Sequence, residues 1–223
     1  MASLSVEKAG GARTGTLLAA CVAEHGTAAH PYFAGDALRS GRDAARNLAD
    51  AIHFLCTLHG RFPGIVDLAA GRTIEPIVRS WFAGAGEAMA VERVYLTRLA
   101  VAVGPVPSTP GGPGSETAVI AQRSALSVLA QSDRRGCALG AALAFAIDWM
   151  PVRSLLDAAA ERLGVEAPLN RIGTGHELGI VADNAGADAA AERAMLFGAQ
   201  QLAVQHRGLW DLLEARQRAR HDT

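Results

Sequence analysis

Residues 137–150 read CALGAALAFAIDWM, a very apolar run in which Asp148 is the one charged residue. The spacing predicts a helix that continues to Leu163 and ends at Gly164, which suits a helix terminus. Pro151 is expected to kink it, because proline removes one backbone hydrogen bond and clashes with the preceding turn. The run is shorter than the roughly 20 apolar residues that span a bilayer, so we expect a core helix and no membrane partner.

The composition of the whole chain points to the same class of structure. Among 223 residues there are 46 alanines, and aromatic residues make up only 5%. Alanine is the best helix former, whereas strands favour β-branched and aromatic residues. We therefore predict an all-α protein, an antiparallel bundle of four long helices with short N-terminal and connecting helices.

Glycine and proline divide the chain into segments. Residues 1–13 lack periodicity and are predicted to be a disordered N-terminus, followed by a single helical-bundle domain over 14–220. Residues 104–114 hold four prolines and four glycines and must form a loop. Residues 165–187 are also interpreted as loop. Helices are expected at 36–59, 73–103, 115–135, 137–163 and 188–218.

Charge and cysteine content exclude several classes of protein. The formal net charge is −1, and no clustered basic face of the kind that binds nucleic acid is evident. The three cysteines show no short spacing, which argues against a disulfide framework and fits a reducing, cytoplasmic compartment.

A few polar residues fall where a helix should be apolar. At about 100° per residue, Glu92 and His206 lie within the apolar stripes of their helices, and Tyr95 shares the stripe of Glu92. Gln122 lies on an apolar face of its helix, and Asp148 interrupts the apolar run. A buried carboxylate is costly unless it is paired, so these five residues are the candidates for a polar core cluster or ligand site.

Two interpretations of this cluster remain open. Glu92 and His206 both lie near the middle of their helices and could share one level of the bundle. In the structural interpretation, Glu92 pairs with His206 or an arginine, and Asp148 satisfies backbone or arginine groups. Such pairs can fix helix register. In the functional interpretation, the same residues bind a ligand or a metal ion.

A metal site would draw on Asp50, His53, Glu92 and His206. Asp50 and His53 are spaced like the Glu-x-x-His motif of di-iron bundles, so iron, manganese or zinc are the metals to consider. Two features count against this site. Asp50 lies opposite the main apolar stripe of its helix, and no second motif of this kind follows.

The remaining polar residues have simpler interpretations. His59 lies in the last turn of its helix, where a cation suits the helix dipole. The arginines at 216, 218 and 220 are expected to form a solvated helix end. Nucleophile and phosphate-loop motifs are missing, which favours a non-enzymatic protein.

Four segments carry a resemblance: ARNLAD (45–50), LHG (58–60), PSTPG (107–111) and QSDR (131–134). Together they look like a family of uncharacterised bacterial proteins with no assigned activity, and this resemblance implies nothing about chemistry. The helical layout also resembles ferritin-like bundles, through Asp50 and His53 alone.

The sequence thus leaves the function unknown, with three hypotheses. The first is a non-enzymatic helical protein that binds a partner or a small apolar ligand, with loops 104–114 and 165–187 as the variable surfaces. The second is a metal-binding, ferritin-like bundle with oxidoreductase activity. The third is a structural component that forms a homo-oligomer through alanine-rich faces.

Overall fold

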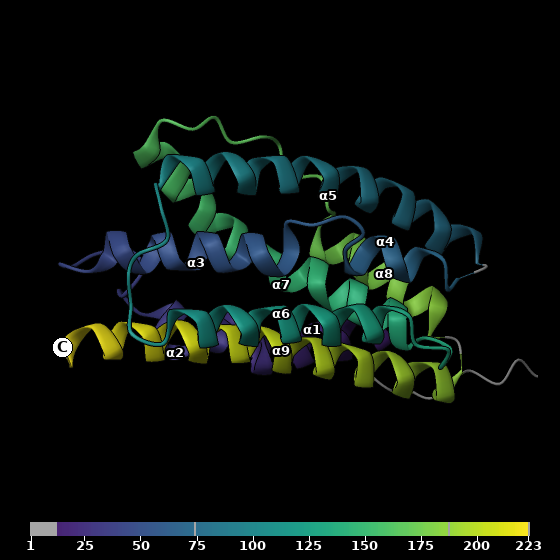
Figure 1. Ribbon diagram of the computed structural model, residues 1–223. Coiled ribbons are helices and arrows are strands. Elements are labelled where there is room, and N and C mark those ends of the chain that lie inside the picture. Colours follow the sequence, from purple (N-terminus) through teal and green to yellow (C-terminus); the bar gives the residue numbers. More distant parts are fainter. Residues whose placement is uncertain (1–12, 74, 187, 223) are drawn as a thin grey trace, which may run out of the picture.

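The computed structural model describes residues 13–73, 75–186 and 188–222, and every regular element in these ranges is helical (Figure 1). The predicted all-α class is therefore confirmed for the described residues. In chain order the elements are α1 (Thr14–His25), the 3-10 turn η1 (Thr27–Ala29), α2 (Pro31–Ala34), α3 (Ala44–His59), α4 (Ile65–Ala70), α5 (Pro76–Ala102), α6 (Gly112–Ala130), α7 (Cys137–Leu163), α8 (Gly175–Ala185) and α9 (Ala189–His221).

Helix α7 is the central element. It packs against α1, α4, α5, α6, α8 and α9, and its residues from Cys137 to Ala146 are all buried. The helix continues through Pro151 to Leu163. It is long and apolar enough to cross a membrane, but 78% of its most apolar window is buried inside the protein, as in the core helix of a soluble protein.

Helices α7 and α9 approach each other backbone to backbone. A Cβ added at Gly140 would overlap the backbone of Met195, and one added at Gly198 would overlap the carbonyl of Cys137. Gly136 faces Ala191 in the same way, so residue numbers rise together along the two helices. The pair therefore runs parallel, and the antiparallel order expected from the sequence does not extend to it. The four-helix arrangement as a whole stays a prediction.

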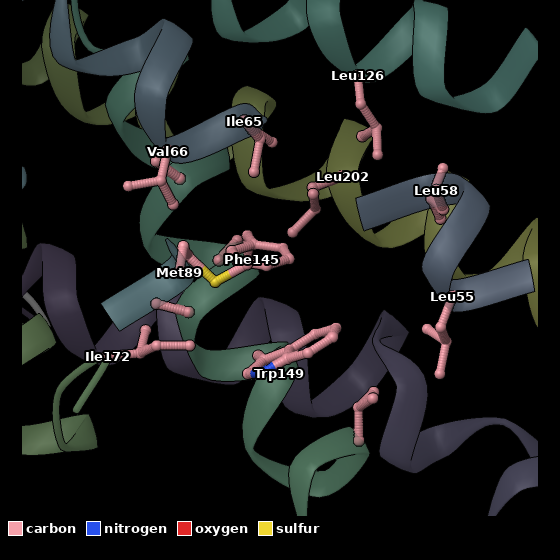
Figure 2. Packing of buried hydrophobic residues seen from close by; sticks show 14 of the residues in the cluster. Leu55, Leu58, Ile65, Val66, Met89, Leu126, Phe145, Trp149, Ile172 and Leu202 are labelled. Atoms are coloured by element: carbon pink, nitrogen blue, oxygen red, sulfur yellow. The ribbon is translucent and has the colours of Figure 1, made fainter. Parts of the chain in front are cut away.

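The hydrophobic core surrounds α7. Figure 2 shows Phe145 and Trp149 of α7 among apolar side chains from α3, α5 and α9, including Leu55, Met89 and Leu202. The rings of Phe145 and Trp149 stack with their centroids 5.5 Å apart.

Several helix starts differ from the predictions, and two of them have a clear physical cause. The helix expected from Asp36 begins only at Ala44, because Gly41 adopts a φ of 93° that a right-handed helix cannot accommodate. The helix expected over 115–135 occupies Gly112–Ala130 instead, with Pro113 in its first turn, where a missing N–H does no harm.

The prediction of a loop throughout 165–187 was wrong, because α8 forms within it. Thr174 accepts a hydrogen bond from the backbone N–H of Glu177, whose side chain accepts one from the N–H of Thr174. This capping box satisfies the helix N-terminus and is readable from the sequence as T-x-x-E. The predicted disordered terminus lies, up to residue 12, outside the described residues.

Candidate functional site

Asp148 is the centre of a buried hydrogen-bond network, here called the Asp148 centre. His206 Nδ1 of α9 lies 2.6 Å from Asp148 Oδ2. Thr27 donates to the same carboxylate twice, from its backbone N–H at 2.7 Å and its hydroxyl at 2.6 Å, and accepts from Trp210 Nε1 at 3.0 Å. Gly26 permits this approach, since a Cβ there would overlap the Asp148 carboxylate.

These contacts keep Asp148 ionised. Burial opposes ionisation, but the hydrogen bonds from His206 and Thr27 outweigh it and lower the pKa of Asp148 below its ordinary value. A carboxylate only accepts hydrogen bonds, so His206 carries a hydrogen on Nδ1. The sequence had anticipated backbone groups as partners of Asp148, and the Thr27 N–H is one.

His59 of α3 packs against this centre from the other side. Its ring lies 5.0 Å from that of His206 and 5.7 Å from that of Trp149, centroid to centroid. Burial, together with His206 and Arg93, lowers the pKa of His59 well below its ordinary value, so the ring is neutral near pH 7. The predicted role of His59 as a cation at a helix end was therefore wrong.

The Nε2 atoms of His59 and His206 are both buried without a hydrogen-bond partner. They border a narrow gap that Trp149, Trp210 and Leu209 also line. The gap is too narrow for a water molecule. The gap has no room for a substrate. The two histidine Nε2 atoms therefore belong to the packed core and do not form a binding site.

Glu92 belongs to a second cluster. It accepts hydrogen bonds from Trp149 Nε1 at 3.0 Å and from Arg153 Nη1. Arg153 also donates to Asp157 at 2.7 Å, and Tyr95 donates to Asp157 at 2.9 Å. Burial raises the pKa of Glu92, although both N–H donors act in the opposite direction. The arginine that the structural interpretation anticipated for Glu92 is thus Arg153.

The predicted cluster of five is divided three ways. Asp148 and His206 meet at one centre, whereas Glu92 and Tyr95 are joined at another through Arg153 and Asp157. Trp149 donates to Glu92 and packs against His59, which borders the Asp148 centre. Glu92 and His206 do not pair directly. Gln122 of α6 lies apart from both, with its side-chain nitrogen against Gly208 of α9.

The four predicted metal ligands do not converge either. Asp50 is bound by arginines, and His53 Nε2 lies 2.7 Å from the carbonyl oxygen of Gly104. Glu92 and His206 belong to the two separate clusters. Asp50 is also fully buried, in contrast to its expected position opposite the apolar stripe.

Within the described residues, one group of three donor side chains has its ligand atoms close together: His30, Asp211 and Glu214. His30 Nδ1 accepts a hydrogen bond from the N–H of Tyr32, so Nε2 carries the ring hydrogen and donates to Asp211 at 3.0 Å. Binding a metal at Nε2 would leave an anionic ring, so this hydrogen bonding does not fit a metal site.

A third buried cluster involves the C-terminal helix and the proline-rich loop. Arg216 contacts Asp50 through Nε at 3.2 Å and Nη2 at 2.9 Å, and Arg220 pairs with the same carboxylate. Arg220 also donates to Thr109 at 3.0 Å. The prediction of a solvated tail was wrong for Arg216 and Arg220. It is right for Arg218, which is exposed and pairs with Glu214.

Beside this third cluster lies a cleft of about 410 Å³, here called the loop cleft. Helices α3 and α6, loop 104–114 and Arg216 of α9 enclose it. Its lining residues are His53, Phe54, Thr57, Val106, Pro107, Ser108, Thr109, Gly112, Pro113, Glu116 and Arg216.

A second cleft of similar volume lies around residues 131–136. Two of its arginines are paired, Arg72 with Asp133 at 2.6 Å and Arg135 with Glu75 at 3.3 Å, and the third, Arg134, lies over the ring of Phe197. These side chains are largely exposed, and such pairs contribute little. Of the two clefts, only the loop cleft is bordered by a buried charged side chain.

The fold and these clusters define an all-α protein with charged pairs buried between helices and a cleft under a proline-rich loop. The chain belongs to a family of unknown function, DUF6975, which matches residues 22–221. Searches among curated proteins and among solved structures find no match. The resemblance inferred from the sequence, to an uncharacterised family, is therefore confirmed, and the function stays unassigned.

Proposed function

We propose that the protein binds a small organic molecule with an apolar body in the loop cleft. The observation that carries this proposal is the cleft itself, whose volume of about 410 Å³ falls in the range of small-molecule sites, roughly 300–1,000 Å³. Phe54, Val106, Pro107 and Pro113 supply apolar walls. This develops the hypothesis that loop 104–114 forms a binding surface.

The loop is held in place by contacts with two helices, α3 and α9. His53 of α3 bonds to the carbonyl of Gly104, Arg216 of α9 donates to that of Pro107 at 3.3 Å, and Arg220 donates to Thr109. Prolines further restrict its backbone. A wall that is ordered before binding lowers the entropy cost of taking up a ligand, which favours a binding role.

The hydrogen bonding in the cleft favours binding over catalysis. Thr57 donates to the carbonyl of His53 at 3.1 Å, and Thr109 donates to that of Pro107 at 3.3 Å. His53 is engaged by Gly104. The histidine and both threonines of the cleft are therefore occupied by backbone carbonyls, which favours binding in the cleft over proton transfer by these side chains.

The test uses the neutral fluorescent dye N-phenyl-1-naphthylamine and a variant that fills the cleft. Gly112 lines the cleft with open space where its Cβ would lie, so Gly112→Phe should occupy the cleft without disturbing the fold. We expect dye binding to weaken by at least about tenfold, which corresponds to about 1.4 kcal/mol.

The matched control is Gly114→Phe, two residues further along α6, which also has open space but does not line the cleft. It should bind the dye like the wild type. Dye binding that is absent from the wild type, or equal in the two variants, would overturn the proposal.

Four further expectations from the sequence stay predictions: a cytoplasmic location, a bacterial source, a four-helix bundle, and a homo-oligomer or protein partner.

A further inference from the structure

Helix α5 has an exposed face that is largely apolar. The helix lies along one edge of the molecule (Figure 1), and its other side packs against α3, α4, α7 and α8. On the exposed face Val91 is 47% exposed, Val94 61% and Val101 78%. Scattered apolar residues are common on protein surfaces, whereas apolar residues that gather on one face are typical of an interaction site.

The residues of this face have the spacing of a helix that pairs with a second helix. They recur at intervals of three and four residues, and all six are exposed: Gly84, Glu87, Val91, Val94, Arg98 and Val101. A mean interval of 3.5 residues keeps such a set on one side of a helix. The set, here called the α5 stripe, is about 26 Å long.

Gly84 is not required by the packing of the single chain. It lies inside α5, where glycine costs about 1 kcal/mol relative to alanine. A Cβ at this position would meet no atom of the described chain within 4 Å. Glycine lets another surface approach the backbone closely, so contact with a second molecule would account for this residue.

Two opposite charges lie on the stripe. Glu87 and Arg98 are eleven residues apart on α5, too far to reach each other, and no opposite charge lies three or four positions from either one. Within the part of the chain that the structure describes, neither side chain forms an ion pair. Both are exposed, so both can pair with a partner molecule.

An antiparallel pairing of two α5 helices brings these opposite charges together. With a twofold axis between residues 92 and 93, Glu87 of each chain lies opposite Arg98 of the other, so one symmetric contact forms two ion pairs. A parallel pairing would set Glu87 against Glu87 and Arg98 against Arg98. The charges therefore favour the antiparallel arrangement.

The apolar residues match in the same arrangement. The axis sets Val91 opposite Val94 of the second copy, so the centre of the contact is apolar. It also sets Gly84 opposite Val101, so the most exposed valine of the stripe meets the residue that leaves most room. The charges and the side-chain sizes thus fit one and the same alignment.

We propose that the α5 stripe binds the α5 stripe of a second copy of this chain, in an antiparallel homodimer with twofold symmetry. None of its residues lines the loop cleft, so this inference does not depend on the proposed ligand. A net charge of −1 does not oppose self-association. Contact along one helix is smaller than a standard interface, so we expect a dissociation constant of about 1–100 μM.

Analytical ultracentrifugation of the full chain, from about 1 to 500 μM, tests the dimer. Val94→Asp lies next to the axis and enters the contact twice, so it should weaken dimerisation by at least about tenfold. The matched control is Val204→Asp on α9, which is similarly exposed and should dimerise like the wild type. Equal effects of the two variants overturn the proposal. A chain that is monomeric throughout also overturns it and leaves the face to another kind of partner.

Exchange of the charges tests the alignment. Glu87→Arg or Arg98→Glu alone places two like-charged pairs in the contact and should weaken the dimer by about tenfold. An equimolar mixture of the two variants should form a heterodimer, because each arginine then faces a glutamate. Both residues are exposed, so both variants should fold. Single variants that dimerise like the wild type, or a mixture that stays monomeric, overturn the antiparallel pairing.

Discussion

The Asp148 centre and the Asp50 cluster each hold one buried carboxylate, but they compensate it differently. Asp148 has a single histidine, together with the backbone N–H and hydroxyl of Thr27, deep in the core. Asp50 has two arginines and lies next to a cleft. At the Asp148 centre, the polar atoms without a hydrogen-bond partner are the Nε2 atoms of His59 and His206, which lie in a narrow gap. At the Asp50 cluster, the arginine Arg216 also lines the loop cleft, which is the better setting for a ligand.

The largest expected effect is on the Asp148 centre. Asp148→Ala would leave His206 and both Thr27 donors buried without an acceptor, so we expect a loss of about 3–5 kcal/mol in the free energy of unfolding. Urea denaturation measures it. Asp133→Ala, at an exposed ion pair, should change stability by less than about 1 kcal/mol. A loss at Asp148 no larger than at Asp133 would mean that this network does not stabilise the core.

Removal of an arginine at the Asp50 cluster should cost less. Arg216→Gln leaves Asp50 paired with Arg220, so the carboxylate keeps a charged partner and we expect a loss of about 1–2 kcal/mol. The same urea experiment applies. A loss as large as that of Asp148→Ala would show that both arginines are needed structurally, and the contrast between the two sites would disappear.

The smallest expected effect is the contribution of His59 to the pH dependence of the free energy of unfolding. Its pKa is lower in the folded protein than in the unfolded chain, so the unfolded chain binds more protons below about pH 6.5. Stability should therefore fall as the pH drops through 6.5, with a slope of at most about 1.4 kcal/mol per pH unit. Asp148, whose pKa is also lowered, acts in a separate window below about pH 4.

Stability measured between pH 8 and pH 5 tests this, with His59→Phe as the comparison. The variant keeps a ring against Phe145 and Trp149 but cannot be protonated. Its stability should depend less on pH than that of the wild type over this range. Identical pH profiles would assign the dependence to other groups.

Helical periodicity in the sequence identified several of the polar residues that lie in the core. It placed Glu92, His206 and Asp148 inside, because an angular count around one helix shows which side chains share its apolar face. The structure buries all three. The same count cannot show which helix lies opposite, so Arg153 and Thr27 were not identified as their partners.

The Asp50 cluster was missed for a related reason. Arg216 and Arg220 lie one turn apart and can reach the same carboxylate, but in the sequence they resemble an ordinary charged helix end. Only the packing of α9 against α3 and the proline-rich loop makes them buried. The sequence offered one signal of this cluster. Arg216 and Arg220 are four residues apart on one helix, and Asp50 is an isolated carboxylate on another.

The close approach of α7 and α9 has a consequence for how these helices can move. Gly140, which packs on Met195, lies eight residues before Asp148 on α7, and Gly198, which packs on Cys137, lies eight residues before His206 on α9. Each glycine contact is thus about 12 Å from the Asp148–His206 pair along the axis of its own helix. If α9 slid by one turn, bulkier residues would collide with the backbone at one contact, and the carboxylate would lose its imidazole at the other. The two helices are thereby locked against sliding, and any opening of the molecule must come from the elements around them.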